Sequence, residues 1–274
     1  MSAPPTVVVF CWGGEREYTL AHAKTVQDMI RRHCAEPVRF VAISDEPPID
    51  GLEVMPMPEG AKALAHLKTP EGDRFPSSYR RLWLFSDEAR CLGERILLTD
   101  IDVVATGDWS PFWQSGADFV GWRPVEQWGR GPNRLAGGMW LLRTGTRPEV
   151  YDRFVRDPAA CIAEARAADY RGSDQAWISY CLARSAEVWP AGAGIGSIRH
   201  LAKGHPQGRT FSPGRLRVVH FNGRDKPWHA SVQAKHRWVA QHWGPPSSPG
   251  REMPRGMGTA AAGRHSLHRR RARR

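Results

Sequence analysis

Apolar residues form two kinds of pattern near the start of the chain: short continuous runs and a segment with helical spacing. The β-branched run TVVVFCW (Thr6–Trp12) is short and continuous, which is typical of a buried strand. Apolar residues then recur at helical spacing within Tyr18–Cys34, and VRFVAIS (Val38–Ser44) is a second short apolar run. This strand–helix–strand order predicts a parallel sheet with right-handed crossovers.

Similar patterns continue to about residue 243 and predict one α/β domain over residues 1–244. Residues 245–274 are rich in Gly, Ala, Pro and Arg, cannot bury apolar surface and are expected to form a disordered basic tail. Residues 60–77 are expected to form a loop or a broken helix. Further strands are expected at Gly51–Met57, Arg95–Leu98, Ala117–Trp122, Gly137–Arg143 and Leu216–Phe221. Further helices are expected at Ser77–Arg90, Pro148–Arg156, Ser173–Ala183 and Ser231–Trp243.

Charge is distributed unevenly along the chain. Its 274 residues carry a formal net charge of +11, to which Pro249–Arg274 contributes eight arginines against one glutamate. The body is therefore mildly basic, which suits a protein that binds anionic nucleotides or surfaces. Two interpretations of the tail stand side by side: a solvated end without function, and attachment to an anionic membrane surface.

Cysteine usage and the absence of targeting signals favour a cytoplasmic protein. The five cysteines are scattered, odd in number and free of CxxC spacing, so they predict neither a disulfide framework nor a zinc site. The start MSAPPTVVVF has no basic region before its apolar run, and no stretch is apolar enough to span a bilayer. We expect a cytoplasmic location, with peripheral attachment to the inner membrane face through the tail.

Two carboxylates follow a predicted strand in the segment LLTDIDVVATGDW. Asp100 and Asp102 alternate where the strand turns into a loop, so they can converge on one cation. In open α/β sheets ligands bind at the carboxyl ends of strands. An acidic turn without function is the alternative for this motif alone. Asp108 is expected to cap the turn at Ser110–Trp113.

A second polar cluster follows the late strand in VVHFNGRDKPWH. His220 closes the strand, Gly223 lets a backbone approach a phosphate closely, and Lys226 is a mobile point charge suited to phosphates. Two carboxylates, an imidazole and an ammonium together suit a divalent metal that holds a diphosphate. The alternative is an ordinary strand-to-helix loop.

These two segments resemble the metal-dependent GT-A glycosyltransferases of the glycogenin and lipopolysaccharide galactosyltransferase (family 8-like) type. The resemblance extends to YRRL (Tyr79–Leu82), AGGMWLL (Ala136–Leu142) and SDQAW (Ser173–Trp177), in the same order, and spans most of residues 6–243. It implies a GT-A, Rossmann-like fold with a mostly parallel central sheet flanked by helices. It also implies hexosyl transfer from a nucleotide-diphosphate sugar, with UDP-hexose as the expected donor, to a glycan or lipid-linked acceptor with retention of configuration.

The resemblance assigns metal and diphosphate contacts to named residues. It implies that Asp100, Asp102 and His220 hold Mn²⁺, or Mg²⁺ in its place, and that the metal bridges the donor diphosphate. Gly223 and Lys226 would then lie along the diphosphate.

Further donor contacts follow from the same resemblance. Arg81 would reach the donor sugar or phosphate, although Arg80 beside it is an equal candidate and a solvated helix face is the alternative. Ile101, between the two aspartates, would contact the nucleotide. Asp174 and Gln175 match the polar pair beside the reacting sugar carbon, with helix capping as the alternative.

The chain departs from the family pattern at two places. Ala136 stands where the family usually has Asn, which leaves the donor sugar open. The first strand leads into CWGGEREY, where Trp12 or Tyr18 could stack on a nucleobase and Glu15 could bond the base or the ribose. A core position is an equal interpretation of Trp12.

Two other classes of protein share parts of these patterns. The segment DIDVV also fits the motif of a haloacid-dehalogenase-like phosphatase, but that class needs an early strand and a later acidic metal motif, which SDQAW does not supply. The arginine tail would suit a non-catalytic nucleic-acid-binding protein. The tryptophans lie mainly in the body and the tail has none, so no specific nucleic acid is expected.

Overall fold

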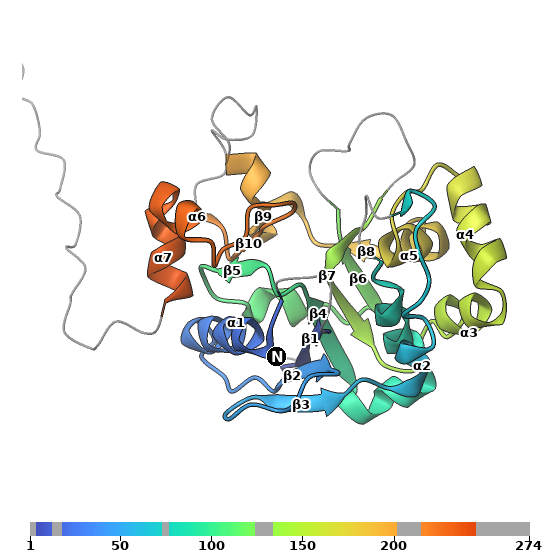
Figure 1. Cartoon of the computed structure of the whole chain (residues 1–274), viewed down its shortest axis with the longest axis horizontal. Coiled ribbons are helices and arrows are strands. Elements are labelled where there is room, and N and C mark those ends of the chain that lie inside the picture. Colours follow the sequence, from blue (N-terminus) through green and yellow to red (C-terminus); the bar gives the residue numbers. More distant parts are fainter. Residues whose placement is uncertain (1–3, 13–17, 73–76, 124–133, 202–214, 245–274) are drawn as a thin grey trace, which may run out of the picture.

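The protein is built around one large sheet and one small sheet (Figure 1). The computed structural model describes residues 4–12, 18–72, 77–123, 134–201 and 215–244. The large sheet has seven strands in the order β3-β2-β1-β4-β7-β6-β8, and the small sheet has three in the order β5-β10-β9. Strand bounds are β1 Thr6–Cys11, β2 Phe40–Ser44, β3 Glu53–Pro56, β4 Arg95–Thr99, β5 Val103–Ala105, β6 Phe119–Trp122, β7 Ala136–Arg143, β8 Glu187–Val188, β9 Ile195–Ser197 and β10 Val218–His220.

Most strand pairs of the large sheet are parallel, as the sequence predicted. β1 pairs in parallel with β2 on one side and β4 on the other, and β2 pairs in parallel with β3. β7 runs antiparallel to both β4 and β6, and β6 pairs in parallel with β8. Strand order reverses direction between β1 and β4, and the region beyond the carboxyl ends of strands at such a reversal is where open α/β sheets bind ligands.

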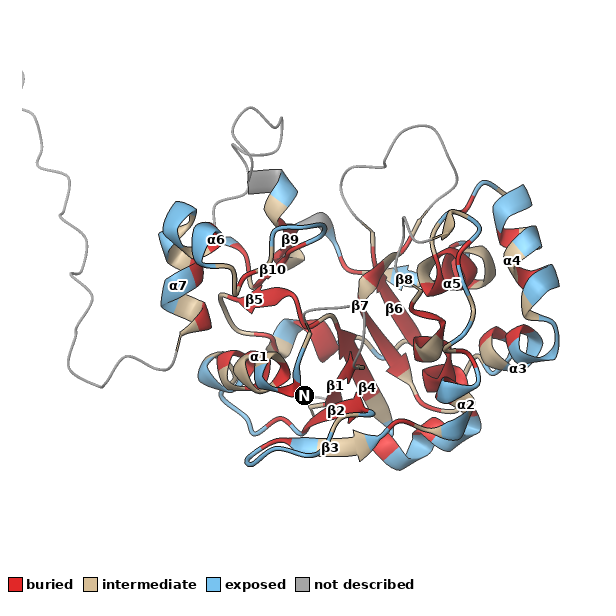
Figure 2. Ribbon diagram, viewed as in Figure 1, coloured by how far each residue is buried: buried red, intermediate tan, exposed pale blue. Residues whose placement is uncertain are grey.

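Helices cover both faces of the large sheet (Figures 1 and 2). Alternate β1 side chains enter two different cores: Val7 and Val9 pack with α1, whereas Val8 packs with the 3-10 helix η2 and with α3 and α5. Helix bounds are α1 Leu20–His33, α2 Glu59–Lys62, η2 Tyr79–Phe85, η3 Asp87–Leu92, η4 Ser110–Trp113, α3 Glu149–Arg156, α4 Pro158–Ala167, α5 Asp174–Leu182, η5 Ala191–Ala193, η6 Ile198–Leu201, α6 Ala230–Lys235 and α7 Arg237–Trp243.

Several predicted elements differ from the structure. The helix expected over Ser77–Arg90 is instead the pair η2 and η3, separated by extended Ser86, because η2 is buried nearly all round and follows its packing rather than α-helical periodicity. The helix expected over Ser231–Trp243 breaks at His236 into α6 and α7. Helix α4 and the short strands β5, β8 and β9 had not been predicted.

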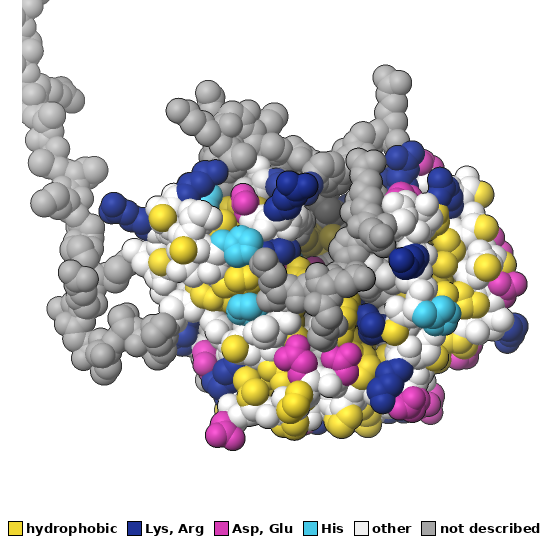
Figure 3. All heavy atoms as spheres, viewed as in Figure 1, with side chains coloured by type: hydrophobic (Ala, Val, Ile, Leu, Met, Phe, Trp, Pro, Cys, Tyr) yellow, Lys and Arg dark blue, Asp and Glu magenta, His cyan; other side chains and the backbone are white. Residues whose placement is uncertain are grey.

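The charge of the body is not gathered on one patch of the visible surface. On the face shown in Figure 3, lysine and arginine side chains lie among acidic and apolar ones. Within the described residues, every helix is too short or too polar to cross a lipid bilayer. The predicted basic tail, residues 245–274, lies outside the described residues.

Candidate active site

The Asp-x-Asp turn joins the two sheets. Asp100 follows β4, and its backbone N–H donates to the Gly138 carbonyl of β7 over 2.8 Å. The Asp102 carbonyl accepts from Phe221 N–H at 2.8 Å, at the end of β10 in the small sheet. Both carboxylates are therefore held where β4, β7 and β10 meet.

Arg81 lies between two carboxylates that come from different elements. Its Nη1 is 2.6 Å from Asp100 Oδ1, and its Nη2 is 2.8 Å from Asp174 Oδ2. Burial alone would lower the pKa of the Arg81 guanidinium, but Asp174 and Asp100 hold that pKa above its usual range. The side chains of Arg81 and Asp174 are 10% and 2% exposed and that of Asp100 is 31% exposed, so the network is buried at Asp174 and open to water at Asp100.

Lys226 forms a second network on the other aspartate. Its Nζ pairs with Asp102 Oδ2 and donates to the Tyr18 hydroxyl over 2.8 Å. Tyr18 in turn donates to Asp102 Oδ2 over 3.1 Å. Burial and then the charge of Asp100 raise the pKa of the Asp102 carboxyl, while Lys226 and Tyr18 oppose that rise. Three distant segments thus share one carboxylate oxygen.

His220 is fully buried, and among the residues that the structure describes neither of its ring nitrogens has a hydrogen-bond partner. Its ring stacks on Trp122 of β6 with centroids 4.8 Å apart and planes 23° apart. Burial lowers the pKa of the imidazole to about 4, although Asp100 opposes the change. His220 is therefore neutral near pH 7, the form that binds metals.

The glycine pair of β7 leaves room between these side chains. A Cβ on Gly138 would lie 2.6 Å from Asp100 Oδ2 and 3.0 Å from His220 Nδ1. A Cβ on Gly137 would lie 2.9 Å from Gln175 Cβ and 3.2 Å from an Arg81 nitrogen. The strand can approach both groups only because it carries no side chains there.

We call the space above Gly138, bordered by Asp100 and His220, the Gly138 cradle. The side chains in and beside it are of the kinds that bind divalent metals, but they are not arranged around a metal position. Among the described residues, no group of three or more His, Cys, Asp or Glu side chains forms a metal site. Asp100 Oδ2 and the unpartnered His220 Nδ1 border the same space above Gly138, whereas the Asp102 carboxylate is engaged by Lys226. Two carboxylates and a neutral imidazole are suitable ligands for Mn²⁺ or Mg²⁺ once Asp102 is released.

Asp174 and Gln175 do not act as helix caps. Asp174 accepts from the Ser173 hydroxyl at 3.0 Å and pairs with Arg81, and Gln175 Oε1 accepts from Gly137 N–H at 3.3 Å. No side-chain cap bond is made at Ser173. The N-terminus of α5 is thereby joined to the Asp-x-Asp turn. Asp108, in contrast, does cap its turn, through Ser110 N–H over 2.9 Å.

The residues expected near the nucleobase are dispersed. The Trp12 ring has Arg80 over it, 4.6 Å from its centroid, whereas Arg81 pairs with Asp100 and Asp174. The hydroxyl of Tyr18 reaches the Asp102–Lys226 pair. Ile101 as a whole residue is 4% exposed and packs in the core. Glu15 lies outside the described residues.

Some neighbours of the site were not assigned a role from the sequence. The sequence placed Gly137 and Gly138 in the segment AGGMWLL without giving them a role. It predicted Trp122 only as the end of a strand. Gly223 has φ +116°, and a Cβ there would lie 3.4 Å from an Arg199 guanidinium nitrogen. Arg199 therefore adds a second cation beside the turn that carries Lys226.

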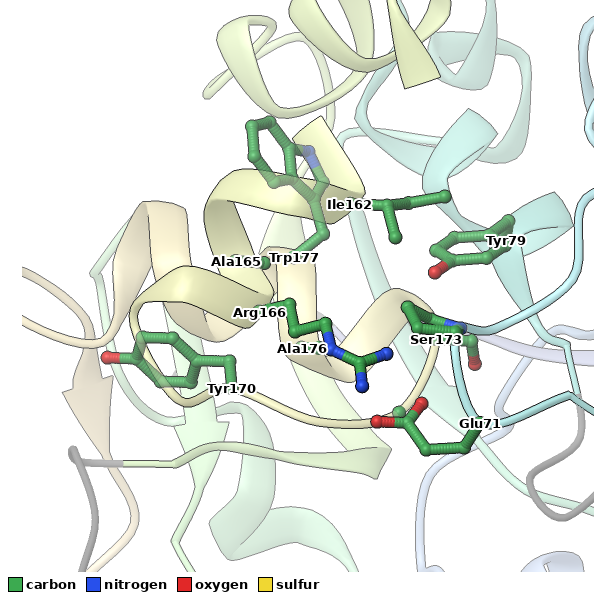
Figure 4. Close-up of a pocket in the computed structure, with 11 residues that line it drawn as sticks. Glu71, Tyr79, Ile162, Ala165, Arg166, Tyr170, Ser173, Ala176 and Trp177 are labelled. Carbon is green, nitrogen blue, oxygen red and sulfur yellow. The ribbon is translucent and has the colours of Figure 1, made fainter. Parts of the chain in front are cut away.

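A small pocket lies behind the start of α5 (Figure 4). The segment before η2 and helices α4 and α5 line it, with Glu71, Arg166 and Ser173 among the polar groups. None of the expected metal or diphosphate ligands contributes to its wall. It is thus separate from the cradle above Gly138.

Comparisons with known proteins agree at the level of the fold. No family model matches the chain, and no curated protein matches it. The galactosyltransferase LgtC, solved with donor and acceptor sugar analogues, superposes with a TM-score of 0.62 at 14% identity over 87% of this chain and 95% of that chain. The glycosyltransferase GlyE of Streptococcus pneumoniae gives 0.53 at 13% identity, over 87% of this chain and 62% of its own longer chain. Mouse xyloside xylosyltransferase 1 gives 0.51 at 12% identity, over 81% and 98%. The chain thus has the GT-A fold that these glycosyltransferases share, as its sequence resemblance predicted.

Proposed function

We propose that this protein is a Mn²⁺-dependent hexosyltransferase that moves a sugar from a nucleotide-diphosphate sugar to a glycan or lipid-linked acceptor. UDP-hexose is the expected donor. The observation that carries the proposal is the convergence of Asp100, Asp102, His220 and Lys226 at the strand ends of a GT-A fold, beside the Gly138 cradle. We propose a cytoplasmic location, with residues 245–274 reaching an anionic membrane surface.

The first task of such a site is to stabilise the leaving diphosphate. When bound, the metal would neutralise charge on the diphosphate oxygens as the sugar–phosphate bond breaks. Asp100, Asp102 and His220 would hold it. Lys226 would turn from Asp102 toward the diphosphate, where its ammonium offsets the remaining negative charge. Gly223, at φ +116°, allows the turn that carries Lys226 to approach the phosphates.

The second task is to support the sugar carbon as it becomes cationic. Asp174 and Gln175 stand at the start of α5, one on Arg81 and the other on the Gly137 backbone. In this proposal Gln175 faces the reacting carbon, Asp174 keeps Arg81 in place, and Arg81 keeps Asp100 oriented. Transfer with retention of configuration is the outcome that the family resemblance implies.

The rival functions have less support. A phosphatase of the haloacid-dehalogenase type carries its aspartate motif after an early strand and needs a later acidic metal motif. Here the motif follows β4, the fourth strand in chain order, and Asp174 of SDQAW pairs with Arg81. A nucleic-acid-binding function would depend on residues 245–274. Deletion of Pro249–Arg274 distinguishes a transferase from a nucleic-acid-binding protein. A transferase keeps its turnover without these residues, whereas a protein that binds nucleic acid through its tail loses its affinity.

Ligand-induced stabilisation tests the proposal directly. The melting temperature would be measured with UDP, GDP and ADP, each with and without Mn²⁺, followed by an array of nucleotide sugars scored for hydrolysis. A ligand that binds only the native state stabilises it by about 2.7 kcal/mol at roughly 100-fold excess over Kd. If millimolar nucleoside diphosphates with Mn²⁺ leave the melting temperature unchanged, the proposal is wrong.

A further inference from the structure

Tyr18 lies in contact with both members of the Lys226–Asp102 pair. Its hydroxyl donates to Asp102 Oδ2 over 3.1 Å and accepts from Lys226 Nζ over 2.8 Å. Its ring also lies under the ammonium, with Nζ 5.2 Å from the centroid. One side chain therefore fixes both the carboxylate and the cation, through a hydrogen bond to each and a cation–π contact.

The pair that Tyr18 holds is incompatible with a metal on Asp102. Lys226 Nζ forms an ion pair with Asp102 Oδ2, and the Tyr18 hydroxyl donates a hydrogen bond to the same oxygen. The Asp102 and Lys226 side chains are only 10% and 15% exposed. A divalent cation at that oxygen would meet a buried like charge, and like charges repel strongly where water is excluded. Within the described part of the chain, Asp102 is the one carboxylate in ion-pair reach of Lys226. The ammonium therefore needs a new anionic partner before it can leave.

A nucleoside diphosphate supplies that partner. Lys226 has a long flexible stem and lies in a turn just after Gly223, so its ammonium can swing without moving β10. The release of Lys226 to the phosphates frees Asp102 for the metal, and a metal on Asp102 pushes Lys226 toward the phosphates. Each ligand thus raises the affinity for the other, and such coupling is reciprocal.

We propose that Tyr18 is a positioning residue that keeps Lys226 on Asp102 until a nucleoside diphosphate arrives, so that the metal and the nucleotide bind together rather than singly. This inference rests on the proposed function. It gives Tyr18 a place at the metal and diphosphate end of the site, in addition to any contact with a nucleobase.

The test measures metal binding, not turnover. Free Mn²⁺ would be quantified by electron paramagnetic resonance during titration of the full chain, without nucleotide and with saturating UDP. Tyr18→Phe removes the hydroxyl without changing charge. It should tighten binding of Mn²⁺ alone by about fivefold, on the order of one or two hydrogen bonds, and reduce the coupling factor between Mn²⁺ and UDP by the same ratio. Lys226→Met should tighten binding of Mn²⁺ alone further and weaken UDP.

Two matched variants serve as controls. Arg224→Met removes an exposed positive charge from the same turn, and Tyr151→Phe removes a phenol hydroxyl from α3. Each should change the affinity for Mn²⁺ alone by less than about twofold, because neither group touches Asp102. A larger effect of Arg224→Met would show that Lys226 acts only through general charge and would overturn the proposal.

The outcomes separate this inference from the function on which it rests. If the wild type binds neither Mn²⁺ nor UDP at millimolar concentrations, the proposed function fails. If the wild type binds both with coupling, but Tyr18→Phe leaves the affinity for Mn²⁺ alone unchanged or lower, only the role of Tyr18 fails. If Tyr18→Phe does not fold, Lys226→Met tests the inference instead. Unchanged affinity of Lys226→Met for Mn²⁺ alone would show that the Lys226 ammonium does not compete with the metal for Asp102 and would refute the inference.

Discussion

The two aspartates of the Asp-x-Asp turn are neutralised in different ways. Asp100 pairs with Arg81, a buried residue of η2 that also pairs with Asp174 at the start of α5. Asp102 pairs with Lys226, which comes from the turn after β10 and shares its partner with Tyr18. Arg81 has two carboxylates and a planar guanidinium that fits both, whereas Lys226 is a point charge on a flexible stem. The difference indicates one pair that is part of the folded framework and one that can exchange.

The surroundings of the two pairs also differ, although both are largely buried: the side chains of Arg81 and Asp100 are 10% and 31% exposed, and those of Lys226 and Asp102 are 15% and 10% exposed. Arg81 belongs to a helix in which six of seven residues are buried, including Leu82 and Trp83 of the core. Removing Arg81 would leave Asp174, whose side chain is 2% exposed, and the partly exposed Asp100 without their shared cation. Lys226 instead has a single carboxylate partner among the described residues and lies in a turn with exposed Gly223 and Arg224. Each prediction below tests whether the two pairs differ in this way.

The largest effect is expected for Arg81→Met. Breaking a buried pair by removing one partner typically costs about 3–5 kcal/mol, because the other charges stay buried and uncompensated. The free energy of unfolding, measured by urea denaturation, should fall by this amount. Lys226→Met should lower it by clearly less, and equal losses for the two variants would remove the distinction between a fixed and an exchangeable pair.

Asp102→Asn should lose activity while keeping the fold. The change preserves shape but removes the charge of a hard-cation ligand, and a loss of about 100-fold or more in Mn²⁺-stimulated nucleotide-sugar hydrolysis is expected, at or beyond the range seen for residues that only support metal ligands. Circular dichroism should match the wild type, and Asp100→Asn should behave similarly. Full turnover of Asp102→Asn with Mn²⁺ would exclude this carboxylate from the site.

Much of the framework could be predicted because it is local. The apolar runs of β1, β2 and β4 and the spacing of α1 follow from neighbouring residues. The Asp-x-Asp motif follows one apolar run, and the polar turn that carries Lys226 follows the run that ends near His220. The family resemblance then predicted that these residues lie together. The sequence could not show which charge pairs with which, since the Arg81–Asp174 and Tyr18–Lys226 contacts join distant segments through tertiary packing.

The same limit explains the missed elements. η2 is a 3-10 helix because its side chains are enclosed by α2, α3 and α5, which no local pattern records. The role of the β7 glycines is likewise a property of what faces them: Asp100 and His220 at Gly138, and Gln175 and Arg81 at Gly137. Only the assembled sheet brings these groups together.

Substitutions of Gly138 and Gly137 are expected to have effects of intermediate size and to separate the surroundings of Asp100 from those of Arg81. In Gly138→Ala the new methyl would displace Asp100 Oδ2 and His220 Nδ1, so Mn²⁺ affinity with UDP present should fall by about 10-fold, within the range for groups that support metal ligands. In Gly137→Ala the methyl would press on Gln175 and Arg81, so turnover should fall with a smaller change in Mn²⁺ affinity. Equal Mn²⁺ affinities of the two variants would show that the cradle above Gly138 is not the metal position.

The smallest effect on turnover is expected for removal of the tail. Residues 249–274 carry eight arginines against one glutamate. They are distant in sequence from Asp100 and Asp102. Basic residues near anionic lipid contribute about 1 kcal/mol each and lose this contribution as salt rises. The full chain should therefore co-sediment with vesicles containing phosphatidylserine at low salt, and the chain ending at residue 248 should do so far less. Turnover on a soluble acceptor should be equal for the two, because neither Arg81 nor Lys226 depends on the tail. Equal sedimentation would exclude attachment through the tail, and unequal turnover would show that the tail acts on the site itself.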